Sequence, residues 1–358
     1  MNKQLANLDS LRAFAVLVVL ASHLVGMLQF RGIVKFELAA LGHIGVLAFF
    51  VHTSLVLMFS LERLSQVRDK VVRRFYNSRA LRIYPLAILS VLIMLLFRIP
   101  EPYLANPFVL PSKLVIASNF LLVQNLIGKT SILGPLWSLP FEVQMYVVLP
   151  VCFYVAIRRR STMYILLLIG AFSALALFVD RVTGHSNLLG YVPCFLSGVL
   201  AYTLNHKYIP KIPSGVWPVL LLVWFSGATA LKMTAPRYAL LSSWLMCLAL
   251  GFSIGIFRDS RMRVWNRVTN NIAKYSYGIY LLHTPLIYLV FRVWKIESNL
   301  LATGVWLLAT YGASFIAFHC LEFPFIRLGK RLSESLIRVK IEVPVPVLAG
   351  SKSAAVGR

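Results

Sequence analysis

An arginine and a histidine stand eleven residues apart in the first apolar stretch of the chain, where Arg12 and His23 interrupt a mostly apolar run. Eleven residues are about three helical turns, so the two side chains share one helix face, roughly 16 Å apart along the axis. Ionisable groups inside a membrane helix are costly unless they face protein or a wet cavity. We therefore expect both to line a common polar cavity. In the alternative, Arg12 only anchors the helix at the headgroups and His23 packs against a neighbouring helix.

Composition identifies an all-α polytopic membrane protein. The 358 residues are 59% hydrophobic and only 13% charged, whereas about 25% of residues are charged in soluble proteins. The net charge of +24 lies mostly between apolar stretches, as membrane topology requires, so we expect membrane lipids and no nucleic acid as partners. The four cysteines lie in separate apolar segments, without disulfide or metal spacing, and are expected to pack in the core.

Ten stretches approach the roughly 20 apolar residues that a membrane-spanning helix requires. They run approximately over residues 11–30, 38–61, 81–97, 137–157, 163–179, 188–204, 216–231, 238–257, 275–293 and 300–321. An eleventh apolar piece, residues 114–127, is shorter, contains Asn119, Gln124 and Asn125, and precedes Gly128. This piece is predicted to be a short re-entrant segment, which membrane depth tolerates only where protein or water satisfies the backbone.

The distribution of basic residues supports this count and gives an orientation. The connection over residues 62–82 carries seven basic residues, and Arg158, Arg159 and Arg160 form a second basic cluster. Both belong on the cytoplasmic side by the positive-inside rule. An even number of crossings must separate them, so residues 114–127 should not cross, and both termini are predicted to be cytoplasmic. Residues 1–332 form one transmembrane domain, and residues 333–358, rich in Ser, Gly and Pro, are predicted to be a disordered cytoplasmic tail.

Other polar residues recur near the ends of the apolar stretches. They are Arg79 and Arg82 at the third stretch, Trp137, Ser138 and Glu142 at the fourth, Tyr280 and His283 in the ninth, and Glu322 at the end of the tenth. No His-x3-His or paired carboxylates occur at ligand spacing. His43 and His52 lie nine residues apart, on opposite helix faces, so we expect no metal site.

These stretches together resemble the membrane-bound acyltransferase family 3, whose members O-acylate bacterial polysaccharides and related glycans. The matching segments are Arg12 to His23 with the Arg-x10-His spacing, Phe75 to Pro85 at the third span, Trp137 to Tyr146 with the Trp-Ser-Leu-x-x-Glu-x-Gln-x-Tyr pattern, and Ser276 to Pro285 in the penultimate span. The resemblance extends from Leu8 to about Arg327. Two positions depart from the family pattern: Leu47 replaces the acid of Gly-Val-Asp, and Val143 replaces a second acid. We expect these departures to affect the choice of donor or acceptor.

The resemblance implies an O-acyltransferase of the bacterial inner (cytoplasmic) membrane. It would move an acyl group, most often acetyl, from acyl-CoA (acetyl-CoA) on the cytoplasmic side to a hydroxyl of an envelope or secreted glycan, or of a lipid-linked glycan. Acyl-CoA would be a co-substrate, with no permanently bound cofactor. His23 would be the general base or acyl carrier, because imidazole titrates near neutrality. Arg12, Arg79 and Arg82 would bind the phosphates of the donor, although Arg79 and Arg82 also fit ordinary positive-inside anchoring.

The remaining site residues have equally explicit alternatives. Glu142 would act in catalysis by orienting His23, or it would bind the glycan. In the alternative, its carboxylate only stabilises the start of its helix through the helix dipole. Trp137, Ser138, Tyr280 and His283 would contact substrates, and His283 is equally well explained as a packing residue. A non-catalytic membrane scaffold, for which the buried charges would be unnecessary, is one rival function, and a transporter or flippase of a lipid-linked or small amphipathic substrate is the other. The transporter predicts two similar halves, which the sequence does not show.

Overall fold

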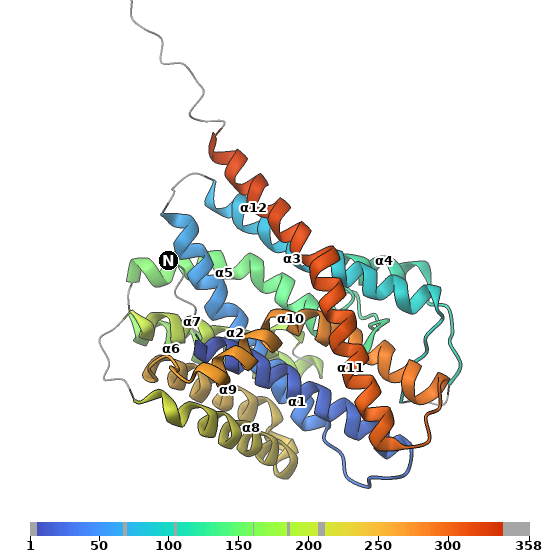
Figure 1. Cartoon of the computed structure of the whole chain (residues 1–358). Helices are drawn as coiled ribbons and strands as arrows, with labels where there is room; N and C mark the ends of the chain where they lie inside the picture. The colour runs from blue at the N-terminus through green and yellow to red at the C-terminus, as the bar shows by residue number, and fades with distance from the viewer. Residues whose placement is uncertain are drawn as a thin grey trace, which may run out of the picture.

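The computed structural model describes residues 6–66, 70–103, 106–159, 161–184, 187–206 and 212–338, without the side chains of residues 157–159 and 336–338. Throughout these ranges the regular structure is helical, and no strand occurs in them. Figure 1 shows the helices gathered into a bundle, with the C-terminal helix projecting beyond it. Arg160 of the basic cluster and residues 339–358 of the predicted tail lie outside the described residues.

Each predicted span overlaps a helix. These are α1 (Ala6–Phe30), α2 (Ala39–Ser65), α3 (Val71–Leu96), α5 (Leu139–Arg159), α6 (Thr162–Thr183), α7 (Val192–Asn205), α8 (Trp217–Thr234), α9 (Ala239–Ile256), α10 (Arg263–Tyr288) and α11 (Asn299–Ala317). In the described part of the chain, eight helices are long and apolar enough to cross a membrane. The all-α, multi-pass membrane fold is therefore confirmed. The count of ten stays a prediction, because α7 is short and the first half of α10 is polar and basic.

The segment predicted not to cross forms one short helix, α4 (Lys113–Leu121). Its nine residues extend about 14 Å, far less than the roughly 30 Å of a bilayer core. The following loop is tied back to it by Asn119, whose Nδ2 donates to the Thr130 carbonyl at 3.0 Å and whose Oδ1 accepts from the Ile132 amide at 2.9 Å. The chain itself therefore satisfies backbone groups in this irregular segment.

The last apolar helix does not end where the tail was expected to begin. A π-helical turn, Phe318–Glu322, joins α11 to α12 (Phe323–Arg338). α12 packs along α3, and the two project together from the bundle (Figure 1). The helix thus continues beyond the predicted boundary after Leu332.

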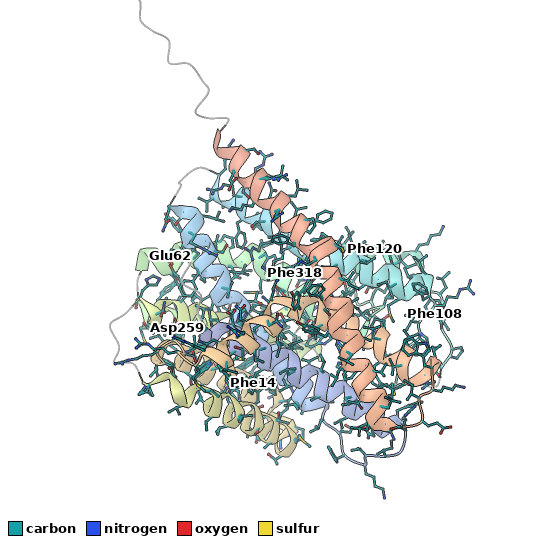
Figure 2. The ribbon with its side chains drawn as sticks, in the orientation of Figure 1. Phe14, Glu62, Phe108, Phe120, Asp259 and Phe318 are labelled. Atoms are coloured by element: carbon teal, nitrogen blue, oxygen red, sulfur yellow. The ribbon has the colours of Figure 1, made fainter. Side chains whose placement is uncertain are left out.

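Helix α1 lies centrally and packs most extensively against α2 and α10. Its approach to α2 is close because Gly45 has no side chain: a Cβ there would lie 2.8 Å from the Ala15 carbonyl oxygen. Hydrogen bonds hold both ends, from Asn7 Nδ2 to the Arg258 carbonyl at 2.9 Å and from Arg31 Nη1 to Asn299 Oδ1 at 2.7 Å. Side chains fill the space between the helices (Figure 2). The positions of Arg12 and His23 are therefore fixed by a helix anchored at each end.

A second close contact joins α2 and α7 and can be tested by substitution. A Cβ on Gly198 would overlap Ser54 Oγ and the Val51 carbonyl oxygen, so Gly198→Ala should destabilise the protein by about 1–3 kcal/mol through overpacking. Thermal unfolding in detergent measures the effect. Gly170→Ala in α6 is the matched control, because open space surrounds that glycine and alanine favours a helix by about 1 kcal/mol. Equal melting temperatures of the two variants would contradict the packing described.

Candidate active site

Two neighbouring cavities lie along α1, one lined by Arg12 and the other by His23. The arginine cavity, of about 80 Å³, is lined by polar residues from α1, α2, α3, α5, α10 and the 3-10 turn before α5, among them Arg12, His52, Thr53, Arg79, Arg82, Ser138, Glu142, Tyr146 and Ser276. The histidine cavity, of about 470 Å³, is lined by residues that include Ser22, His23, Glu37, His43, Tyr103 and Trp137. Val46 and Tyr280 line both cavities and form the wall between them.

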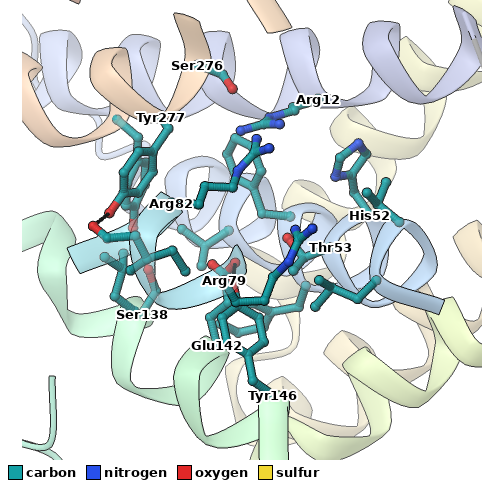
Figure 3. A pocket seen from close by; sticks show the side chains of 18 residues that line it. Arg12, His52, Thr53, Arg79, Arg82, Ser138, Glu142, Tyr146, Ser276 and Tyr277 are labelled. Carbon is teal, nitrogen blue, oxygen red and sulfur yellow. Dashed lines mark hydrogen bonds between the residues drawn. The ribbon is translucent and has the colours of Figure 1, made fainter. Parts of the chain in front are cut away.

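The arginine cavity concentrates positive charge. Arg12 comes from α1, while Arg79 and Arg82 lie three residues apart on one face of α3, and their guanidinium groups turn into the same space (Figure 3). Arg79 Nη2 donates to Ser60 Oγ at 3.3 Å. The buried Nε atoms of Arg12 and Arg79 have no hydrogen-bond partner among the described residues. Such donors, held in a fixed array, suit an anion with several oxygens, such as a phosphate.

Two carboxylates oppose this charge. Glu142 lies in the first turn of α5, and its Oε1 accepts a hydrogen bond from Tyr146 at 2.7 Å. Glu322 lies at the end of the π-helical turn and is buried, and its Oε1 has no partner in the described structure. Arg82 and Arg12 are its electrostatic neighbours. The sequence predicted no role for Glu322. A lone acid closing an apolar stretch was the available signal, and π-helical turns often occur at functional sites.

The histidine cavity places two rings against His23. His23 Nδ1 lies 2.6 Å from the Tyr103 hydroxyl, with ring centroids 5.6 Å apart. The His283 ring meets it edge to face, with centroids 4.7 Å apart. His283 is completely buried. His23 is thus held by one residue from a loop and another from α10.

Tyr103 was not predicted, because it lies in the connection between α3 and α4, away from any periodic apolar pattern. Burial, with Glu101 nearby, raises the pKa of the Tyr103 phenol above its ordinary value. Burial likewise raises the pKa of Glu101. The Tyr103 hydroxyl therefore keeps its proton throughout the neutral range and can donate it to His23 Nδ1.

Hydrogen bonds hold the wall between the cavities. The Tyr280 hydroxyl donates to the Pro135 carbonyl at 2.8 Å, and Ser138 Oγ donates to the Tyr280 oxygen at 2.8 Å. Pro135 and Ser138 belong to the 3-10 turn Gly134–Ser138 that precedes α5. The expectation that Arg12 and His23 line one common cavity is therefore wrong. Helix periodicity placed both on one face of α1, but Tyr280 and Val46 occupy the space between them.

The same arrangement corrects the role expected of Glu142. α5 starts at the wall, directly after the 3-10 turn, so its first turn faces the arginine cavity. Glu142 binds Tyr146 there, and the ring and hydrogen-bond contacts of His23 are with Tyr103 and His283 instead. Glu142 therefore does not orient His23, and it lies where it balances the arginines.

The predicted substrate residues divide between the cavities. Trp137 lines the histidine cavity, where His43 stacks on it with centroids 5.7 Å apart and planes 8° apart. Lys232 Nζ lies 3.0 Å from His43 Nδ1. Ser138 lines the arginine cavity. Neither His43 nor Lys232 was predicted at the site. Among the described residues, no group of three or more His, Cys, Asp or Glu could hold a metal ion.

These features define a class of protein. It is a multi-pass helical bundle in which helix α1 contributes an arginine to a cationic cavity and a histidine to a second cavity beside it. The model of the acyltransferase 3 family, described as an acyltransferase domain, matches residues 5–319. The chain therefore belongs to this family and is a membrane acyltransferase. No curated protein matches the chain significantly, and no solved structure does.

The contact between Tyr103 and His23 can be tested by chemical modification. Tyr103→Phe removes the hydroxyl that occupies the Nδ1 lone pair, so diethyl pyrocarbonate should modify His23 several-fold to about tenfold faster, as expected for the loss of a hydrogen bond worth about 0.5–1.5 kcal/mol. Mass spectrometry of the digested protein measures the rate at His23. Tyr84→Phe is the control, because its hydroxyl bonds the Leu121 carbonyl outside both cavities. An unchanged rate in Tyr103→Phe would refute the contact.

Proposed function

We propose that this membrane acyltransferase transfers an acyl group, most simply acetyl, from acyl-CoA to a hydroxyl of an envelope or secreted glycan. The observation that carries the proposal is the pair of cavities meeting at one wall, cationic on one side of Tyr280 and containing an imidazole on the other. Phosphate binding and proton removal from a hydroxyl require these two chemistries. Membership of the acyltransferase family favours this function over transport.

The donor is assigned to the arginine cavity. Coenzyme A carries several phosphates at one end and its thioester at the end of a long flexible arm. Arg12, Arg79 and Arg82 offer the phosphates guanidinium donors, two of which have an unpartnered buried Nε in the described structure. The arm then reaches the wall at Tyr280, while the phosphates stay at the arginine end. This end is assigned to the cytoplasm of a bacterial inner membrane, since the basic connection over residues 62–82 lies there.

The acceptor is assigned to the histidine cavity. This cavity is the larger of the two, at about 470 Å³, and it combines an aromatic ring, Trp137, with the polar groups of Glu37 and Ser22. Sugars are recognised by such combinations, with ring faces against aromatic side chains and hydroxyls on polar atoms. The acceptor is a glycan, free or on a lipid carrier, that approaches from the side opposite the donor.

The reaction is a direct acyl transfer. His23 Nδ1 accepts the proton of the sugar hydroxyl as its oxygen attacks the thioester carbonyl. The new C–O bond forms, the C–S bond breaks, and the proton returns from His23 to the coenzyme A sulfur. The products are the acylated glycan and free coenzyme A thiol, so atoms and charge balance. Positioned general bases contribute about 10²- to 10⁴-fold to such steps.

Replacing the base tests the proposal. Membranes containing the protein should transfer label from radiolabelled acetyl-CoA to glycan, and His23→Ala should lower the rate by about 10²- to 10⁴-fold at unchanged membrane abundance. His206→Ala is the control, because His206 lines neither cavity. Mass analysis of surface and secreted glycans from cells with and without the protein identifies the acceptor. Full activity of His23→Ala would eliminate its role as the base.

Donor binding predicts a different kinetic signature. Arg82→Gln and Arg79→Gln should each raise KM for acetyl-CoA by roughly ten- to a hundredfold, because hydrogen bonds to charged groups are worth about 1.5–3 kcal/mol. Arg73→Gln removes the same charge from an exposed position on α3 and should leave KM within about twofold. An equal effect of all three variants would point to general surface charge and contradict a specific phosphate site.

A further inference from the structure

His283 donates one ring proton to a backbone carbonyl. Its Nδ1 lies 3.1 Å from the Ile279 carbonyl oxygen, one turn earlier in α10. A carbonyl only accepts hydrogen bonds, so Nδ1 carries the proton. A neutral imidazole has a single N–H, and Nε2 of His283 is therefore an acceptor with a free lone pair.

This lone pair has no donor within the described part of the chain. His283 Nε2 is buried without a hydrogen-bond partner, and the whole residue is enclosed by the protein. A buried polar atom without a partner is unfavourable and calls for an explanation. The ring in edge-to-face contact with His283 is His23, at 4.7 Å between centroids.

His23 can supply the missing donor. Its Nδ1 faces the Tyr103 hydroxyl at 2.6 Å, and a phenol that keeps its proton donates to that nitrogen. The proton of a neutral His23 then lies on Nε2, the nitrogen left over for His283. The opposite tautomer would set two nitrogen lone pairs against each other whenever the rings align. Tyr103 therefore selects the His23 tautomer whose Nε2–H the free His283 Nε2 could accept.

We propose that His283 is a positioning residue that accepts a hydrogen bond from His23 Nε2–H and thereby makes His23 Nδ1 the basic atom. The inference rests on the proposed function of His23. The acceptor hydroxyl replaces the Tyr103 hydroxyl at Nδ1 and delivers its proton there, while the Nε2–H bond to His283 stabilises the resulting imidazolium. His283 thus does for His23 what a carboxylate does for the histidine of a hydrolytic triad, in which the wrong tautomer lowers kcat by about 10⁴-fold.

The backbone keeps His283 in place for this task. The Trp306 indole of α11 donates to the His283 carbonyl at 2.9 Å, and Gly278 lets α10 approach Ser314 of α11 closely. The position of the ring is therefore fixed by packing that does not involve His23. A residue held in this way can orient its neighbour instead of following it.

Two amide substitutions separate positioning from packing. Glutamine places its amide near Nε2 of the histidine that it replaces, and asparagine places it near Nδ1. His283→Gln therefore keeps an acceptor for His23 and should retain kcat within about tenfold, whereas His283→Asn should lose about 10²-fold or more, with KM for acetyl-CoA within about twofold in both. Size-exclusion profiles and membrane abundance report folding.

The tautomer itself provides a readout that does not depend on activity. Nitrogen NMR of the detergent-solubilised full chain, with heavy nitrogen in its histidines, should show His23 protonated at Nε2, with signals assigned by their loss in His23→Ala. His283→Asn should shift His23 toward a mixture of tautomers, and His283→Gln should not. Protonation of His23 at Nδ1, or equal loss of kcat in both folded amide variants, would overturn the inference. Full activity in His23→Ala would instead show that the proposed function had failed.

Discussion

The clustering of three partly buried arginines inside an apolar bundle is the constraint on which the rest of this structure depends. Removing an ion from water costs several kcal/mol unless charges and hydrogen bonds replace the water. Arg12, Arg79 and Arg82 come from two helices, and the carboxylates that face them, Glu142 and Glu322, come from two other elements. These carboxylates offset part of the positive charge, and in the proposed function the phosphates of the donor supply further negative charge. The helix arrangement and the proposed binding of an anionic donor therefore both follow from the need to stabilise these arginines.

Helix α1 sets the distance between Arg12 and His23. Ser22 Oγ donates to the Leu38 carbonyl at 2.8 Å, and a Cβ on Gly42 would lie 2.7 Å from Ser22 Oγ, so α1 and α2 are locked together beside the histidine cavity. Arg12 and His23 sit on a rigid rod roughly 16 Å apart. A substrate that uses both cavities must be long enough to extend between them. Coenzyme A has this shape, with charge at one end and the reactive group at the other.

Much of the architecture was predictable from the sequence, because apolar length and charge alternate in simple ways along a membrane protein. Every predicted span overlaps a helix, and the short segment around Asn119 does not span. The arginines were predictable as a cluster because all three belong at the same end of the bundle. The wall at Tyr280 was not predictable, because the spacing of residues along α1 cannot show which side chain of another helix lies between Arg12 and His23. Tyr103 could not be predicted for a related reason: it lies in a loop, where the sequence has no periodic apolar pattern.

The division of the site into two cavities has a physical rationale of its own. A continuous polar channel through the bundle would leak ions and expose a thioester to water. Instead, Tyr280 closes the path with bonds to Pro135 and Ser138, each worth only about 0.5–1.5 kcal/mol net. In the proposed reaction the thioester has to pass this wall to reach His23, so these two bonds would have to break when the donor binds.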